Sequence, residues 1–147
     1  MLRKLTLADM DAAAAVHRAA FDHALPWLAG LHTPPEDRWF YSERMFTTCE
    51  LWGVFRDAEM IGLIAFREDW IDQLYVLPQA QGHGVGPQLL QIAKDSFTRL
   101  HLWTFQRNFP ARRFYEVRGF VLVRETEGAE NEEKEPDALY RWTREHA

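Results

Sequence analysis

Residues 81–90 read QGHGVGPQLL, which places three glycines within five residues, followed by a proline and by apolar residues at helical spacing. Glycine loses more backbone entropy on folding than any other residue, so such a cluster marks a backbone that turns sharply or lies close to another group. The apolar segment LYVLP comes shortly before it and has the composition of a strand. The sequence therefore predicts a strand, a close-approach loop and a helix in succession.

The rest of the chain alternates between strand and helix patterns. Strands are predicted at about residues 2–7, 50–56, 60–68, 70–78, 100–106, 120–125 and 138–143. Helices are predicted at about residues 8–23, 34–47, 87–100 and 111–119. Hairpins in the first half and a strand–helix–strand crossover in the second half predict an α/β (α+β) fold. Its mixed, twisted sheet has six to seven strands, with about four helices on both faces.

Length and composition favour a globular protein. The 147 residues predict a single domain over residues 1–147, and 47% of them are hydrophobic. The net charge of -5 argues against nucleic acid or an anionic membrane as a partner, because both attract a basic face. The N-terminus has no long apolar stretch, and nowhere do about eighteen apolar residues run together. We therefore expect a soluble, cytoplasmic protein.

Cysteine and histidine give no metal pattern. Cys49 is the only cysteine, which leaves no internal disulfide and no thiolate cluster within one chain. The six histidines show no His-x-x-x-His spacing. We expect no metal site, and we interpret Cys49 as a small apolar residue without an activating partner.

The glycine cluster has the character of a phosphate loop. The first N–H groups of a helix have no internal partners and carry partial positive charge, and Pro87 fits a first helical turn. Residues 82–86 would then present successive amides to a phosphate or pyrophosphate. A dinucleotide fingerprint is excluded because proline stands where its third glycine belongs. A P-loop is excluded because Gly-Lys-Ser/Thr is missing.

The pattern Gln81-x-x-Gly84-x-Gly86, with LYVLP before it and NFPARRFYEVRGF after it, resembles the GCN5-related N-acetyltransferase (GNAT) superfamily. The resemblance is strong over residues 60–123 and rests on element order elsewhere, and similar sequences form a subgroup of unassigned substrate. It implies the GNAT fold with splayed central strands, and acetyl-CoA as co-substrate. It also implies an N-acetyltransferase, an acyltransferase for groups other than aminoacyl groups, which moves acetyl directly to a primary amine of a small molecule.

The resemblance also implies which residues bind the cofactor. Amides of the glycine loop hold the pyrophosphate, the exposed strand edge pairs with pantetheine, and residues of the next motif bind and line the arm. These positions are Leu74, Tyr75, Val76, Gln81, Gly82, His83, Gly84, Val85, Gly86, Asn108, Ala111 and Phe114. For His83 we expect only the amide to take part, with a solvated side chain. Arg107, Arg112 and Arg113 either meet the ribose phosphate or form an exposed basic face.

Tyr115 is the predicted general acid. It lies seven positions after Asn108, two turns along one helix face, so both side chains can point into one groove. A phenol there can protonate the departing thiolate while a backbone N–H near residues 74–76 stabilises the carbonyl oxygen. The alternative for Tyr115 is a buried ring packed against Phe120.

The base that deprotonates the amine is left open between a carboxylate and water. Glu68, Asp69 and Asp72 lie close to the splayed strand. We favour Asp72 slightly as a catalytic residue because it lies within the strand, although a solvated charge is an equally good interpretation of each of the three.

The first two helices and the loop before the last strand are, by the resemblance, the acceptor groove. The first part carries an aromatic set: Phe21, Trp27, His32, Trp39 and Tyr41. We take Trp27, His32 and Trp39 as substrate-binding, with a cap on the core as the alternative. The second part is acidic, with Glu130, Glu132, Glu133, Glu135 and Asp137. It either attracts an ammonium group or is a solvated charge run.

Two other functions stay open from the sequence. The protein could modify a protein or peptide amine, which an extended open groove would favour over a narrow aromatic one. It could also be a non-catalytic acyl-CoA sensor, against which Tyr115 argues. The acceptor, the acyl chain and a homodimer are likewise left open by the sequence.

Overall fold

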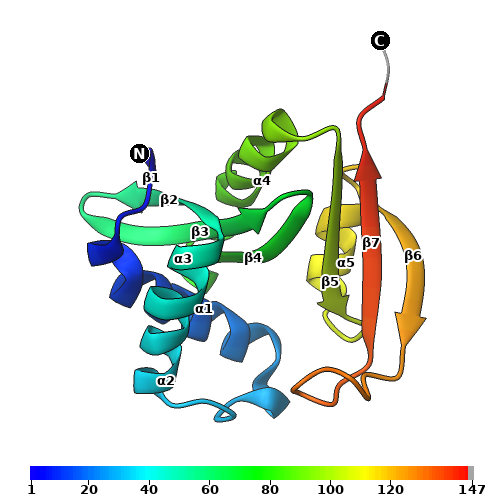
Figure 1. The fold of residues 1–147 in the computed structure, drawn as a ribbon, viewed down its shortest axis with the longest axis horizontal. Coiled ribbons are helices and arrows are strands. Elements are labelled where there is room, and N and C mark those ends of the chain that lie inside the picture. Colours follow the sequence, from blue (N-terminus) through cyan, green and yellow to red (C-terminus); the bar gives the residue numbers. More distant parts are fainter. Residues whose placement is uncertain (146–147) are drawn as a thin grey trace.

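A computed structural model describes residues 1–145. Its seven strands form one mixed sheet in the order β1-β2-β3-β4-β5-β7-β6 (Figure 1). The strands are β1 (Leu2–Lys4), β2 (Glu50–Arg56), β3 (Glu59–Arg67), β4 (Trp70–Val76), β5 (Arg99–Phe105), β6 (Val121–Thr126) and β7 (Asp137–Thr143). The helices are α1 (Met10–Ala24), α2 (Pro34–Trp39), α3 (Phe46–Thr48), α4 (Val85–Ser96) and α5 (Phe109–Glu116). The predicted fold class is confirmed.

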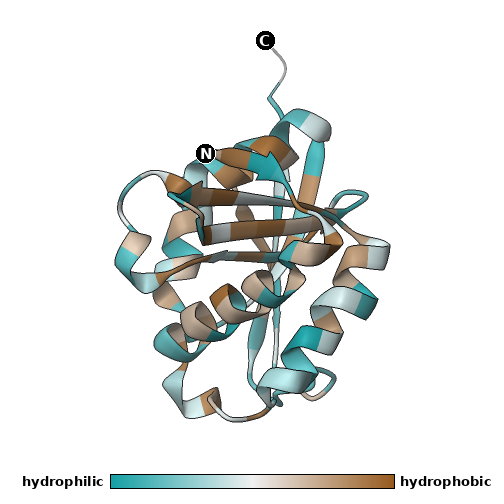
Figure 2. Ribbon diagram, turned by 90° about the vertical axis from the view of Figure 1, so that its left-hand side faces the viewer, coloured by the Kyte–Doolittle hydropathy of each residue, from teal (hydrophilic) through white to brown (hydrophobic). Residues whose placement is uncertain are grey.

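The core lies on both faces of the central strands. Seven consecutive residues of β3, Met60–Phe66, are buried, which requires cover on both faces. Helices α1 and α4 supply it, since each contacts both β3 and β4. Figure 2 shows the same central strands as the most apolar part of the sheet. Gly62 permits the approach of α4, because a Cβ there would lie 2.8 Å from Val85 Cγ1.

Capping boxes begin the two N-terminal helical segments. The Thr6 amide donates to Asp9 Oδ2 at 2.7 Å, and the Thr33 amide donates to Glu36 Oε1 at 2.8 Å. The predicted helix at residues 34–47 is confirmed, with one difference. Its middle, Phe40–Met45, is a π-helical segment between α2 and α3.

The predicted boundaries of the helix after the glycine loop are wrong at both ends. Helix α4 begins at Val85, so Pro87 is its third residue and Gly86 already lies within the helix. It ends at Ser96, and Leu100 belongs to β5 although its spacing fits the helical pattern. A buried strand and a buried helix turn both favour leucine, so periodicity alone misplaces such a residue.

Strand β4 is paired very differently along its two edges (Figure 1). It pairs with β3 from Trp70 to Val76, with one irregularity at Asp72. Its parallel pairing with β5 is confined to Trp70 and His101, next to a bond from the His101 amide to the Asp69 carbonyl at 2.7 Å. The predicted splay of the central strands is confirmed. Among residues 1–145, no helix is long and apolar enough to cross a membrane.

Candidate active site

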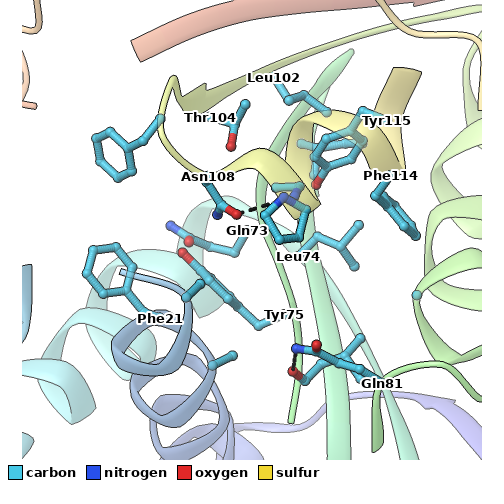
Figure 3. A pocket seen from close by; sticks show the side chains of 18 of the residues that line it. Phe21, Gln73, Leu74, Tyr75, Gln81, Leu102, Thr104, Asn108, Phe114 and Tyr115 are labelled. Atoms are coloured by element: carbon cyan, nitrogen blue, oxygen red, sulfur yellow. Dashed lines mark hydrogen bonds between the residues drawn. The ribbon is translucent and has the colours of Figure 1, made fainter. Parts of the chain in front are cut away.

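A cavity of about 730 Å³ occupies the gap between β4 and β5 (Figure 3). Its lining comes from both faces of the sheet. One end is lined by the last turn of α1 and its C-cap, through Ala20, Phe21, His23, Ala24 and Leu25, and the other by the glycine loop and α5. The edges of β4 and β5 lie between these ends. The cavity therefore runs through the sheet, and two molecules entering from opposite faces can meet in it.

The glycine loop presents free amides to this cavity. Gly82 and Gly84 have φ of +83°, a backbone conformation that residues other than glycine rarely adopt. Within the described chain, the amides of residues 82–86 have no recorded acceptor. Successive unpaired N–H groups at the start of α4 form an anion-binding concavity. The predicted role of Gln81 differs in one respect, because its amide donates to the Pro78 carbonyl at 3.4 Å.

The side chain of Gln81 supports the open edge of β4. Its Nε2 donates to the Val76 carbonyl at 3.1 Å (Figure 3). The Leu77 amide donates to Ile61, so alternation along the ladder directs the Leu74 and Val76 amides away from β3. These two amides face the gap. An extended ligand arm can therefore add to this edge as a further strand would.

Phe114 and Arg118 close the end of the cavity near the glycine loop. A Cβ on Gly86 would lie 3.0 Å from Phe114 Cε1, so the missing side chain lets α4 and α5 approach. Arg118 lies over the Phe114 ring at 4.1 Å and donates to its carbonyl at 3.0 Å. Sequence reasoning missed Arg118. Its position directly before the chain-reversing Gly119 was the available signal.

The arginines named from the sequence are placed elsewhere. Arg107 binds Glu135, with nitrogen–oxygen distances of 2.6 and 2.7 Å. Arg112 donates to the Tyr140 hydroxyl at 2.9 Å, and Arg113 is exposed. None of these three lines the cavity. The side chain of His83 is also exposed and outside the lining.

Tyr115 and Asn108 line the same cavity, as their spacing predicts (Figure 3). Tyr115 is 8% exposed, and its hydroxyl has no recorded partner among residues 1–145. Burial, and then the charge of Tyr75, raises the pKa of the Tyr115 phenol, so it stays protonated at neutral pH. The Tyr115 ring also packs against Phe120, at 5.3 Å between centroids. Asn108 Oδ1 caps α5 by accepting from the Ala111 amide at 3.3 Å.

Asp72 is the one predicted carboxylate that lines the cavity. Its Oδ2 accepts from Arg67 Nε at 2.7 Å and from the Cys49 thiol at 3.2 Å. Burial raises the pKa of this thiol to about 11, so Cys49 stays protonated and is the donor of that bond. Asp69 pairs with Arg99 and His101 at 3.4 Å, and Glu68 is exposed. The described residues contain no group of three metal-ligating side chains.

Of the aromatic set predicted from the sequence, Phe21 lines the α1 end of the cavity and the other four do not. Trp27, His32 and Trp39 lie outside the lining, and Trp39 is 55% exposed. Tyr41 is fully buried in the core, where its hydroxyl lies 2.7 Å from His17 Nδ1. The rings that line this end include Phe21 and Tyr75 (Figure 3), together with Phe105. Phe105 and Tyr75 come from the two splayed strands, which sequence spacing did not connect to α1.

The acidic loop before β7 is an ordered structure. Asn131 Nδ2 donates to the Glu135 carbonyl at 2.7 Å, and the Glu135 amide donates to Asn131 Oδ1 at 3.2 Å. The Glu135 carboxylate accepts from Trp27 Nε1 at 3.2 Å as well as from Arg107. Glu132 lies 3.0 Å from His32. Two of the five acidic residues therefore bind other loops, and the loops at residues 25–33 and 127–136 are bridged.

Comparison with known proteins agrees with this geometry. Residues 13–120 match the family model described as "Acetyltransferase (GNAT) family". The chain belongs to the GNAT family. A relative in Escherichia coli K12, the peptidyl-lysine N-acetyltransferase YiaC, is 30% identical over 73 residues, 49% of this chain and 50% of that protein. An uncharacterized N-acetyltransferase of Archaeoglobus fulgidus is 31% identical over 75 residues, 40% of this chain and 51% of that protein. The chain thus spans about half the length of these relatives.

Solved structures share the GNAT fold over nearly the whole chain. The solution structure of apo YjaB from Escherichia coli has a TM-score of 0.82 at 19% identity, covering 99% of this chain and 98% of that one. The PaiA N-acetyltransferase of Thermoplasma acidophilum, solved with coenzyme A, has a TM-score of 0.71 at 19% identity, with 97% and 98% covered.

Proposed function

We propose that this GNAT protein transfers an acetyl group from acetyl-CoA directly to a primary amine of a small molecule. The observation that carries the proposal is a single cavity through the sheet. In it, Gly82, Gly84 and Gly86 of the loop with free amides, the open edge of β4 and the protonated Tyr115 phenol lie together.

The residues present fit acetyl-CoA. Its pyrophosphate is an anion of the kind that unpaired amides at a helix N-terminus bind, and Arg118 adds a positive charge to the same lining. The pantetheine arm carries amides, which can pair with the edge amides of Leu74 and Val76. Solved structures of related folds in complex with coenzyme A or acetyl-CoA support this choice. When bound, acetyl-CoA supplies a thioester carbonyl open to attack by an amine.

Tyr115 acts as the acid in this proposal. As the C–N bond forms and the C–S bond breaks, the phenol donates its proton to the departing sulfur, and the unpaired edge amides of Leu74 and Val76 are the donors available to the carbonyl oxygen. The amine must lose a proton before it attacks. Asp72 is the lining carboxylate, but Arg67 and Cys49 already occupy its Oδ2, which favours water as the acceptor of that proton.

The bridge between the loops favours a small acceptor. Trp27 and His32 of the first loop contact Glu135 and Glu132 of the second, so an extended peptide could run between these loops only by displacing those contacts. The second candidate, acetylation of peptide lysine, is favoured by the local similarity to the peptidyl-lysine enzyme.

A release assay for free coenzyme A thiol tests the proposal. Purified protein is given acetyl-CoA with amines, aminosugars, amino acids or lysine peptides, and products are identified by mass. We expect amine-dependent thiol release and a product heavier by one acetyl group. Thiol release with peptides alone would support the second candidate, and binding of acetyl-CoA without any transfer would support a sensor.

A further inference from the structure

The α1 end of the cavity is an apolar wall with fixed rings. Phe21 of α1 meets Phe105 of β5 edge to face, at 6.3 Å between centroids and 84° between planes. This contact joins the helix to the splayed strand across the gap. Leu25, which is 2% exposed, continues the wall at the end of α1.

Buried aromatic residues hold this wall from behind. The His17 ring stacks on Phe21 at 6.0 Å and lies 4.4 Å from the Tyr75 ring. Its Nδ1 lies 2.7 Å from the Tyr41 hydroxyl, so the imidazole is fixed. A rigid aromatic surface binds flat apolar groups at a low cost in side-chain entropy.

The polar side chains that line the cavity near this wall are amides, a hydroxyl and the His23 imidazole. Gln73, Thr104 and the Nδ2 of Asn108 line the cavity without a recorded partner among residues 1–145 (Figure 3). The one carboxylate in the lining is Asp72, which Arg67 already pairs. A second ammonium group on the acceptor would therefore meet no unpaired carboxylate in the lining, which makes its burial costly.

Resting on the proposed acetyl transfer, we propose that the acceptor is a small monoamine with a flat apolar or aromatic body that packs on the Phe21–Phe105 wall. Gln73 and Thr104 offer hydrogen bonds to one neutral polar substituent. Polyamines and other multiply charged amines should bind less tightly, because Asp72 is the one carboxylate in the lining and Arg67 already pairs it.

Binding to the protein saturated with coenzyme A tests this assignment without relying on turnover. Calorimetry would compare 2-phenylethylamine, butylamine, spermidine and a lysine peptide. We expect 2-phenylethylamine to bind about tenfold more tightly than butylamine and more tightly still than spermidine, because only it covers the wall. Tighter binding of spermidine, butylamine or the peptide would overturn the assignment.

A matched pair of variants locates the effect. Phe21→Ala should weaken 2-phenylethylamine about tenfold and leave butylamine unchanged. Phe55→Ala removes a partly buried ring from β2, outside the lining, and should leave both amines unchanged. An equal effect of the two variants, or none from Phe21→Ala, would contradict the assignment.

The failure of this inference differs from failure of the proposed function. If spermidine or a peptide is both bound and acetylated, the acceptor class is wrong and acetyl transfer stands. If 2-phenylethylamine binds as expected but no amine releases coenzyme A thiol, the wall binds its ligand and the proposed transfer is wrong.

Discussion

The two edges of β4 differ sharply in their strand pairing. Toward β3 the strand is paired along its whole length, and toward β5 it is paired only at Trp70. The irregularity at Asp72 comes directly after that single pair, and a bulged residue bends its strand. The extra residue, Asp72, therefore lies where the pairing between β4 and β5 stops and the gap between them begins. Strand β4 thus provides both part of the core of the fold and the opening for a ligand.

We expect mutations at the two edges of β4 to affect different properties of the protein. Changes on the β3 side should lower stability and leave ligand binding in the folded protein unchanged. Changes around the gap should alter binding or turnover at little cost in stability.

Tyr115→Phe should lower turnover roughly a thousandfold and leave acetyl-CoA affinity nearly unchanged, because only the proton donor is removed. Steady-state kinetics and calorimetry measure the two quantities. Tyr140→Phe is the matched control, since Tyr140 is buried beside Glu116 outside the lining. Equal turnover in Tyr115→Phe and the wild type would remove the proposed acid.

Leu63→Ala should lower the free energy of unfolding by about 3 kcal/mol, because Leu63 is fully buried in β3 on the paired side. Urea denaturation measures this loss. Acetyl-CoA affinity measured well below the unfolding transition should equal that of the wild type. A large loss of affinity in the folded protein would break the division between the two edges.

Low pH should lower the stability of the protein through His17, which packs behind the Phe21–Phe105 wall. Burial, and then the charge of Arg18, lowers the pKa of His17 to about 4. The unfolded state takes up a proton near pH 6.5 and the folded state near pH 4, so stability falls as pH drops between these values. The expected loss attributable to His17 is about 2 kcal/mol between pH 7 and pH 5. Denaturation of the wild type and His17→Gln at both pH values measures it, and an equal pH dependence in both proteins would refute it.

Gly84→Val should raise the Kd for acetyl-CoA about tenfold, because φ of +83° is unfavourable for valine and the loop must shift. Gly30→Val is the matched control. Gly30 has φ of +88° and open space around it, but it lies outside the cavity. The two variants should lose similar stability and differ in acetyl-CoA affinity. Equal affinities would show that the conformation of the glycine loop does not matter for binding.

The sequence predicted the order of elements and the glycine loop because both depend on local signals. Capping pairs, hydrophobic periodicity and glycine spacing act over a few residues. The acceptor end could not be predicted in the same way. Phe105 meets Phe21 only because β5 splays from β4, and Glu135 binds Trp27 across 108 positions of sequence. Such contacts depend on tertiary packing, which periodicity does not encode.

Amide hydrogen exchange with and without acetyl-CoA tests whether the free amides of residues 82–86 hold the pyrophosphate. We predict that saturating acetyl-CoA slows exchange at residues 82–86 and at the edge amides of Leu74 and Val76. The amides of Gln73 and Tyr75, already bonded to β3, should change little. Unchanged exchange at residues 82–86 under saturating acetyl-CoA would contradict the claim that these free amides hold its pyrophosphate.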